Sequence, residues 1–457
     1  MQARHPDGCG RQRPSPFSPK VTAGDAEVLR LALPALGALV AEPLFLLADS
    51  AIVGRLGTLP LAGLGIAGAA LGAAVSLFVF LAYGTTAGVA RSLGAGDVRG
   101  ALGRGVDGLW LALGLGAVVA VLGTALAPDV VRGLGASPAV EPHAVAYLRW
   151  SMPGLPGMLV VLAATGVLRG LQDTRTPLVV AACGAAFNVA ASIALVHGLG
   201  WGVAGSAVGT AVTQILMAVV LAAVVARAAR RAGAPLRPHV GGLARSARVG
   251  VPLLVRTLSL RAALLLTTYV AAAQGDSAVA AHQVAMTVWT AASLVLDALA
   301  IAAQALVGRA LGAGDTAGVR WSVQRMVVWG VGAGVVLGAA LALARAPFAA
   351  VFTEAGPVRA DLVAVLLVVA LTLPLGGWVF VLDGVLIGAG DGRYLAVTGA
   401  VVLLVYVPMA LAVLALTPRG QEGLLWLWAA FAGGFMAVRL LPLALRARGA
   451  AWMVTGV

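Results

Sequence analysis

Acidic side chains inside apolar stretches are the groups in this sequence best placed to do chemistry. Asp49 lies near the end of the apolar run 28–54, and Glu42 precedes it by about two helical turns, so both face the same side of a helix. Loss of hydration favours the protonated form of a carboxyl group. One interpretation is therefore that Asp49 loads and releases a proton. A second interpretation stays open, in which Asp49 lies near the outer interface, hydrated or paired with Arg55.

A second set of charges lies in the other half of the sequence. Asp297 and Asp383 each interrupt an apolar run, and Arg256 and Arg261 share another run. One interpretation is a second cation or proton site, or a group of side chains facing a cleft. The other is a structural ion-pair network, because charges buried in membranes usually pair with one another. His282 joins this candidate polar site because histidine titrates near neutral pH, although a lone neutral histidine is more often satisfied within a bundle.

Two further polar residues and two prolines complete the candidate set. Asn188 and Ser192 lie one helical turn apart. Asn188 either brings an amide next to the span that carries Asp49 or hydrogen-bonds across helices without a functional role. Pro34 and Pro43 lie inside that same span, where each removes a backbone hydrogen bond and allows a kink. A moving hinge and a static kink both agree with these prolines.

Stretches long enough to cross a membrane must position these residues. Hydrophobic residues make up 60% of the chain and charged residues 11%, with a mean hydropathy of +0.98, which excludes a soluble globular domain. A transmembrane helix needs about 20 apolar residues, and abundant glycine and alanine favour packed helices over a barrel. We expect an all-α integral membrane protein with twelve spans, at roughly 28–54, 60–84, 105–127, 143–168, 177–198, 202–227, 249–273, 279–308, 322–345, 361–387, 394–416 and 423–445.

An internal repeat organises these spans. Residues 91–97 (RSLGAGD) recur at 309–315 (RALGAGD), and the same shift along the chain relates Pro34 to Pro252. Several matches in one register indicate a duplication. Six spans in each copy give both halves the same orientation, which is a parallel repeat, and two like lobes around a cleft suit alternating access.

Arginines divide the loops into two kinds and predict the topology. They are concentrated in alternate loops, and the positive-inside rule places those loops, with both chain termini, in the cytoplasm. We therefore expect a multi-pass protein of the plasma (inner) membrane. Its predicted parts are a cytoplasmic tail at 1–24, a six-helix lobe at 25–226, a cytoplasmic linker at 227–248, a second six-helix lobe at 249–446 and a cytoplasmic tail at 447–457.

Several other classes of function find no support in the sequence. The formal charge of +13 comes from arginines scattered between apolar runs, which indicates topology rather than binding to nucleic acid. Cys9 and Cys183 provide neither a disulfide framework nor a metal site. Residues 63–68 match the dinucleotide motif G-x-G-x-x-G, but no strand precedes them. With no catalytic set of residues, we expect no enzymatic activity and no cofactor.

Motifs in both halves resemble the multidrug and toxic compound extrusion (MATE) family. The second-half motifs are similar to its DinF branch. The resemblance covers essentially all of residues 25–446 and agrees with the topology read from the arginines. The segments that carry it are 49–57 (DSAIVGRLG), 198–205 (GLGWGVAG) with Asn188 before it, 297–314 and 382–391 (LDGVLIGAGD).

This resemblance implies a proton- or sodium-driven antiporter in the lipid bilayer that exports amphipathic organic cations. Because a two-lobed carrier with its own cleft can work alone, we expect a monomer. Asp49 matches the family's cation site in the first lobe, Asn188 also matches, and Pro34 matches the kink proline of the first span. The sequence departs from the family at Ser192, where several members carry a second acid. A two-acid sodium site is therefore disfavoured, and a proton handled mainly by Asp49 is the expectation, with sodium at Asp49 as the weaker alternative.

Other classes of protein remain as alternatives. A flippase for a lipid-linked or other amphipathic substrate needs a cationic cleft, and Arg256 and Arg261 keep this interpretation open. An intramembrane enzyme would need a clustered nucleophile and base or metal ligands, which the sequence does not offer. A receptor-like or structural membrane protein is disfavoured by the repeat, because duplication around a cleft is typical of carriers.

Overall fold

The computed structural model describes residues 24–456, and this part of the chain is helical without any strand. Twelve helical segments in it are long and apolar enough to cross a membrane. The expectation of an all-α membrane protein with twelve spans is thus confirmed. Most of the predicted amino-terminal tail, together with Cys9, lies outside the described residues.

The first six spans form the N-lobe, defined here as residues 25–231. Two of these spans are interrupted: α2 and α3 make one span, and α5 and α6 make another through a short 3-10 turn at Met152–Gly154. The helices are α1 (Asp25–Gly54), α2 (Thr58–Leu77), α3 (Phe80–Gly94), α4 (Val98–Gly133), α5 (Glu141–Ser151), α6 (Leu155–Gly170), α7 (Arg175–Ile193) and α8 (Gly202–Arg231).

The last six spans form the C-lobe, defined here as residues 240–448. Its final span is interrupted by a π-helical turn at Ala429–Phe435. The helices are α9 (Val240–Ala272), α10 (Asp276–Gly312), α11 (Thr316–Phe352), α12 (Gly356–Gly388), α13 (Gly392–Leu416), α14 (Gln421–Trp428) and α15 (Met436–Arg448).

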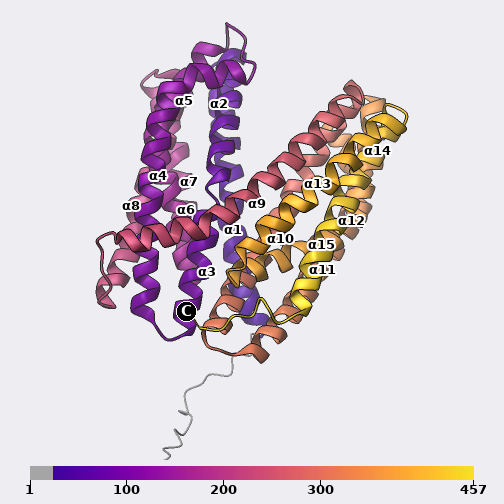
Figure 1. The fold of residues 1–457 in the computed structure, drawn as a ribbon. Helices are drawn as coiled ribbons and strands as arrows, with labels where there is room; N and C mark the ends of the chain where they lie inside the picture. The colour runs from indigo at the N-terminus through magenta and orange to yellow at the C-terminus, as the bar shows by residue number, and fades with distance from the viewer. Residues whose placement is uncertain (1–23, 457) are drawn as a thin grey trace, which may run out of the picture.

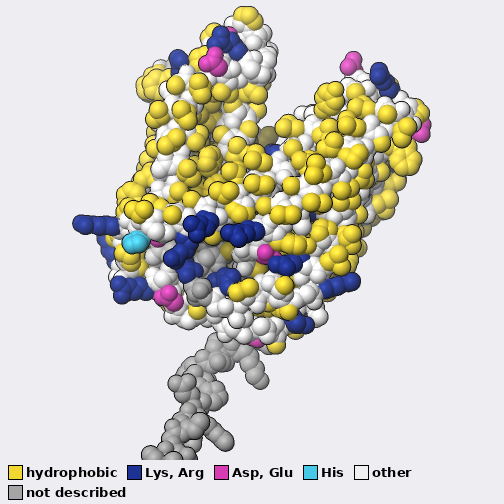
Figure 2. Space-filling view, in the orientation of Figure 1, with side chains coloured by type: hydrophobic (Ala, Val, Ile, Leu, Met, Phe, Trp, Pro, Cys, Tyr) yellow, Lys and Arg dark blue, Asp and Glu magenta, His cyan; other side chains and the backbone are white. Residues whose placement is uncertain are grey.

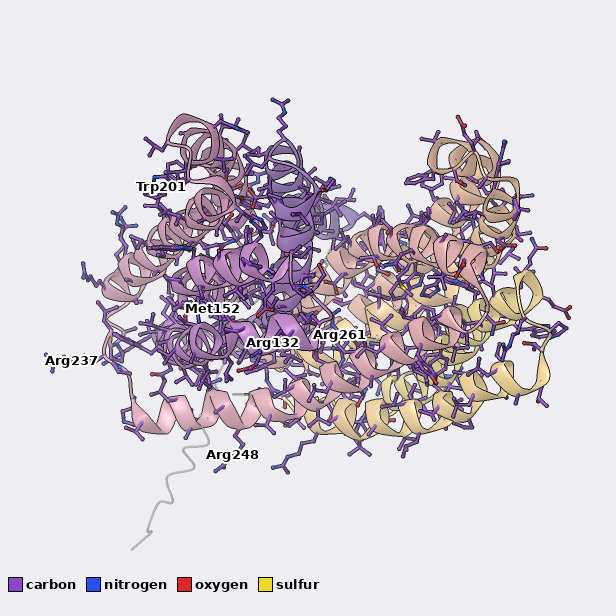
Figure 3. All side chains as sticks on the ribbon, turned by 90° about the horizontal axis from the view of Figure 1, so that it is seen from above. Arg132, Met152, Trp201, Arg237, Arg248 and Arg261 are labelled. Carbon is purple, nitrogen blue, oxygen red and sulfur yellow. The ribbon has the colours of Figure 1, made fainter. Side chains whose placement is uncertain are left out.

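The connection between the lobes is shorter than the sequence predicted. The helices α8 and α9 leave only residues 232–239 outside helix, whereas a linker at 227–248 was expected. The reason is that arginine and alanine are strong helix formers, so both helices continue past the apolar runs that define the spans. The extended start of α9 crosses the N-lobe against α4 before the helix joins α13 in the C-lobe (Figure 1). Viewed from the other direction, Arg237 lies at the outer edge of the N-lobe (Figure 3).

The two lobes form a V. They meet at the end where α1 begins and the chain's last residues lie, called here the closed end, and they separate at the opposite end, called here the open end (Figure 1). Figure 2 shows a deep notch at the open end, with hydrophobic side chains covering both arms and most arginines gathered toward the closed end. A cleft between the lobes is therefore accessible from one side only.

The repeated glycine motifs hold the closed end together. Gly94, at the end of α3, packs so closely on α10 that an added Cβ would overlap the carbonyl oxygen of Arg309. Gly312, at the end of α10, has the same relation to the carbonyl oxygen of Arg91. Small residues let helix backbones approach closely in a membrane. The two copies of the motif thus pack against each other as equivalent partners.

The start of α1 is bound by the opposite lobe. Asp25 accepts hydrogen bonds from the Arg325 guanidinium, with an Nε distance of 2.7 Å, and from the Trp329 indole at 2.7 Å. Glu27 forms an ion pair with Arg309 at 3.6 Å. All three partners belong to the C-lobe, so α1 ties the two lobes together at the closed end.

The last described residues make the reciprocal connection. Arg91 of the N-lobe donates hydrogen bonds to the carbonyl oxygens of Ala389 at 2.8 Å, Val454 at 2.6 Å and Gly456 at 2.9 Å. The Gly456 N–H donates to the Leu311 carbonyl oxygen at 3.2 Å. The segment after α15 therefore crosses to the N-lobe and lies over the glycine motifs (Figure 1).

Candidate functional site

A cluster of polar side chains surrounds Asp49 in the core of the N-lobe. Asp49 is 2% exposed. Its carboxylate accepts hydrogen bonds from the hydroxyls of Thr210 at 2.9 Å, Ser192 at 3.2 Å and Tyr147 at 3.4 Å. The Asn188 amide donates to the Thr210 hydroxyl at 3.0 Å. The cluster therefore draws one side chain from α1, one from α5, one from α8 and two from α7.

The sequence identified part of this cluster and missed the rest. The structure brings Asp49, Asn188 and Ser192 together, although their functional roles stay predictions. Tyr147 and Thr210 were not foreseen, because single hydroxyl groups in apolar helices carry no distinctive sequence signal. Arg55, the alternative partner of Asp49, is exposed and makes no ion pair with it in the described structure.

Asp49 has no counter-ion within the described residues. No arginine or histidine lies within 4.0 Å of its carboxylate, and the hydrogen-bond donors are all neutral hydroxyls. A buried carboxylate without a positive partner is costly, so the site favours binding of a proton or a small cation. Two further oxygens in this region, Asn188 Oδ1 and Ser206 Oγ, are buried without hydrogen-bond partners. The oxygens fit a hard cation as well as a proton.

A network of ion pairs occupies the core of the C-lobe. Asp383 of α12 accepts from Arg256 of α9, with an Nε distance of 3.1 Å, and from Arg439 of α15 at 2.9 Å. Arg256 also lies over the ring of Tyr83 in the N-lobe, 5.9 Å from the ring centroid. Asp383 and Arg256 are therefore paired with each other, as one of the two interpretations of the sequence predicted, and Arg439 is an unforeseen third member.

The other members proposed for this C-lobe site lie apart from the network. Arg261 is exposed and makes no ion pair within the described chain. The physical reason is helical phase, because the spacing between Arg256 and Arg261 places the two side chains on different faces of α9. His282 is buried beside Trp428, with ring centroids 5.5 Å apart, and its Nε2 lies 3.4 Å from the Thr268 hydroxyl. The grouping of Arg261 and His282 with Asp383 is therefore corrected.

Asp297 instead faces a cavity between the lobes. The cavity has a volume of 190 Å³ and is lined mainly by α1, the junction of α2 and α3, α6, α7 and α8 of the N-lobe, while Asp297 enters from α10 of the C-lobe. Most of the wall is apolar. Its polar and charged members are Glu42, Tyr83, Thr165, Arg169, Gln214 and Asp297.

The two prolines proposed as hinges lie in a continuous helix. Pro34 and Pro43 are both inside α1, which runs unbroken from Asp25 to Gly54. Glu42 and Asp49 lie on the same helix, so a bend at either proline would move the cavity wall and the polar cluster together. A hinge role for these prolines stays a prediction.

Twelve spans in two similar lobes, a cleft open at one end and, in one lobe, a buried acid without a positive partner define the class of polytopic membrane transporters. Comparison with known families gives the particular one. The family model named MatE matches the chain twice, at residues 34–194 and 252–412, which is the register of the internal repeat. This chain belongs to the MatE family of MATE transporters, as the sequence motifs implied.

Curated relatives agree with this membership. Protein DETOXIFICATION 44, chloroplastic, from Arabidopsis thaliana is 31% identical over 389 residues, which cover 82% of this chain and 74% of that protein. DNA damage-inducible protein F from Escherichia coli K12 is 28% identical, with 81% of this chain and 82% of the relative covered. A probable multidrug resistance protein NorM from Thermotoga maritima is 24% identical, with 72% of each chain covered.

Solved structures share the fold. A MATE protein in a bent conformation superposes with a TM-score of 0.84 at 22% identity, covering 93% of this chain and 95% of that one. An outward-facing multidrug resistance MATE transporter of the MOP superfamily gives a TM-score of 0.83 at 23% identity, covering 92% and 95%. At this level of identity the similarity concerns the fold alone.

Proposed function

We propose that this protein is an antiporter that exports amphipathic organic cations or drugs in exchange for protons by alternating access. The observation that carries the proposal is the burial of Asp49, which is 2% exposed and has hydroxyl donors but no positive partner among the described residues. A carboxyl group in that setting changes its charge when it gains or loses one proton. Membership of a family of drug exporters supports the same function.

The polar cluster provides a route from protonation to helix movement. When ionised, Asp49 accepts hydrogen bonds from the hydroxyls of Ser192 and Thr210. The Thr210 hydroxyl in turn accepts a hydrogen bond from the Asn188 amide. A protonated carboxyl group is a weaker acceptor, so these contacts between α1, α7 and α8 loosen. In this proposal α1 then bends at Pro34 or Pro43, changes the cavity wall and releases the substrate.

The arginine distribution supports an orientation for this cycle. Most arginines lie toward the closed end, where the start of α1 and the last residues are also found (Figure 2). By the positive-inside rule the closed end faces the cytoplasm and the cleft opens outward. We place the protein in the plasma membrane as a monomer, since one chain contains both lobes and the cleft between them.

The composition of the cluster favours protons over sodium. Asp49 is the only carboxylate among the side chains that contact one another there, and position 192 holds serine instead of the second acid found in several family members. Sodium remains the alternative ion, since Asn188 Oδ1 and the hydroxyl oxygens are suitable ligands.

Transport by the purified protein in liposomes tests the proposal. Efflux of a fluorescent organic cation is measured under an imposed pH gradient and then under a sodium gradient, with wild type compared to Asp49→Asn. The matched control is Asp129→Asn, an exposed acid whose side chain is 66% accessible. We expect proton-driven efflux in wild type and the control, and none in Asp49→Asn.

Two results would count against the proposal. Normal dependence on the pH gradient in Asp49→Asn would remove Asp49 from coupling. A lack of gradient-dependent movement for every cation would favour the flippase interpretation, which stimulation by a lipid-linked oligosaccharide would then support. The pairing of Arg256 with Asp383 weakens that interpretation, because the positive charge expected to line its cleft is partly neutralised.

A further inference from the structure

Arg169 is a buried charged residue that has no role in the proposed transport cycle. It belongs to α6, is 8% exposed and lines the cavity between the lobes. Within residues 24–456 its guanidinium makes no side-chain hydrogen bond and no ion pair closer than 4.0 Å. A buried guanidinium has five donors and normally satisfies them with a carboxylate or phosphate. This one is available to a ligand in the cavity.

The same cavity presents two acids. Glu42 enters its wall from α1 and Asp297 from α10. Asp297 lies within electrostatic range of Arg169, yet no direct ion pair joins the two in the described structure. The cavity therefore holds negative and positive groups that are near one another but unpaired. Such an arrangement is costly when empty of ligand and favours a molecule that supplies both missing charges.

The charges around the cavity also act on it, and both Arg256 and Arg439 lie within electrostatic range of Asp297. Asp383 is engaged by two arginines, Arg256 and Arg439, which leaves one excess positive charge behind the wall formed by Tyr83. In the cavity lining, the two acids Glu42 and Asp297 and the single arginine Arg169 leave one excess negative charge when all three are ionised. Taken together the groups are neutral, so a ligand with no net charge enters at a lower electrostatic cost than a pure cation.

We propose that the cavity binds the head of an amphiphile that carries a cationic and an anionic group together. Its cationic group lies against Glu42 and Asp297, and its carboxylate or phosphate lies on Arg169. The proposal rests on the transport function above and specifies its substrates further, as amphipathic drugs that carry an anionic group beside the cationic one. Arg169 is then the residue that determines specificity.

The size and lining of the cavity agree with a head group. Its 190 Å³ correspond to the share of about six liquid waters, at roughly 30 Å³ each, which accommodates the charged part of a small molecule. Phe45, Met158 and Met217 form apolar wall nearby, and methionine adapts to irregular shapes. The apolar body of the ligand is expected to extend from there into the cleft seen in Figure 2.

The position of Asp297 links binding to the arrangement of the lobes. Glu42 and Arg169 belong to the N-lobe, whereas Asp297 belongs to the C-lobe. A ligand that touches all three stabilises this conformation of the transporter over one in which the lobes have moved apart. The preference for zwitterions is therefore expected in this conformation.

Equilibrium binding of two matched dyes tests the proposal. One is a xanthene dye as its ethyl ester, a cation, and the other is the same dye as the free carboxylic acid, a zwitterion. Fluorescence anisotropy with the purified full-length protein in detergent gives both affinities. We expect wild type to prefer the acid by about 10-fold, Arg169→Gln to lose the preference, and Arg169→Lys to keep part of it.

Control variants separate this effect from misfolding. Arg132→Gln, at an exposed position, keeps the preference for the acid, and Asp297→Asn weakens binding of both dyes because it removes a partner of their shared cationic group. Equal affinity of wild type for the two dyes, or a preference that survives Arg169→Gln in a folded protein, would overturn the proposal. Since no gradient is present, this result is independent of whether proton-driven efflux occurs.

A competition experiment identifies the source of the ligand. A drug-like zwitterion and a zwitterionic lipid head group share the required chemistry. If lysophosphatidylethanolamine displaces the acid dye from wild type and Arg169→Gln abolishes that displacement, the head group of a lipid is the ligand. If the lysolipid has no effect while the preference for the acid dye persists, the site takes soluble amphiphiles.

Discussion

The two lobes are copies of one another, yet only the N-lobe has a buried acid at its polar cluster. The register that relates the copies places Thr267 at the position of Asp49 and Tyr406 at that of Asn188. The hydroxyls of Thr267 and Tyr406 lie 2.6 Å apart in the C-lobe core. The duplicated position thus retains a hydrogen bond between the same two spans but has no group that changes charge near neutral pH. The proposed coupling through this cluster is therefore expected in the N-lobe alone.

A neighbouring position shows the same divergence. Trp428 stands in the C-lobe where Thr210 stands in the N-lobe. Its ring packs against Phe431, with centroids 5.8 Å apart, and against His282. Where the N-lobe has a hydroxyl that binds Asp49, the C-lobe has an aromatic cluster. At this level the C-lobe core is thus filled by aromatic rings, whereas the N-lobe core holds an acid and its hydroxyl partners.

At the positions that line the cavity the difference between the lobes is the opposite, because here the C-lobe carries the charged residues. The C-lobe network consists of Arg256, Asp383 and Arg439. In the N-lobe the equivalent positions hold Ala38, Thr165 and Leu221, which line the cavity between the lobes described above. The corresponding C-lobe cavity has a volume of 10 Å³, against 190 Å³ in the N-lobe. Charged side chains paired with one another fill the space that small and neutral residues leave open. Equivalent positions thus line an open cavity in one copy and a nearly filled one in the other.

The largest effect is expected when Asp49 is replaced by threonine, the residue at the equivalent C-lobe position, Thr267. Asp49→Thr should reduce efflux driven by a pH gradient by at least ~100-fold, because the group that carries the coupling charge is removed. Adding Thr267→Asp should not restore it, since Tyr406 alone cannot replace the donors around Asp49. Initial rates in proteoliposomes check both expectations, and recovery in the double variant would show that the lobes are interchangeable.

Breaking the C-lobe network is expected to reduce stability. Asp383→Asn leaves Arg256 and Arg439 buried without their carboxylate, at a cost of about 3–5 kcal/mol, whereas Thr165→Ala at the equivalent N-lobe position should cost below ~1 kcal/mol. Thermal unfolding in detergent measures the difference. Similar melting temperatures for the two variants would contradict the assignment of the network to structure.

The closed end, where the two copies still resemble each other, should respond symmetrically. Gly94→Ala and Gly312→Ala each push a Cβ into the backbone of the opposite lobe, which should destabilise this conformation by about 1–3 kcal/mol. Gly88→Ala in the same helix as Gly94 is the control, because nothing lies within 4 Å of its added Cβ. Cysteine accessibility at the closed end should rise in both variants and stay unchanged in the control.

The smallest effect is expected at a single hydroxyl. Ser192→Ala removes one donor to Asp49, at 3.2 Å, and gives the N-lobe the alanine that the C-lobe carries at Ala410. Loss of one such bond is worth about 1 kcal/mol, so proton-driven efflux should fall about 5-fold and remain measurable. A complete loss of efflux would mean that Ser192 does more than support Asp49.

Much of the fold was accessible from the sequence because hydropathy and the repeat are properties of single segments. The spans, the two lobes and the importance of the span with Asp49 follow from such local signals. Contacts between residues on distant helices do not follow from local signals. Arg439 was missed because nothing in its own segment indicates that Asp383, which belongs to a different span, lies opposite.

Helical phase would have improved one prediction. Arg256 and Arg261 were grouped because they share a span, although their spacing along the helix turns them to different faces. Tyr147 illustrates the opposite case. It reaches Asp49 across 98 positions in sequence because α5 packs on α2 and α8, which both contact α1, and no local pattern in these segments specifies that packing.

The contacts at the closed end also set an order of events during synthesis. Asp25 is synthesised early, but its partner Arg325 follows 300 residues later. Val454 is likewise synthesised 363 residues after its partner Arg91. These bonds have the long sequence separations that slow folding. While the C-lobe is still being inserted, the N-lobe has no partner to close against. The seal between the lobes is thus the part of the molecule to be completed last, after both lobes are in the membrane.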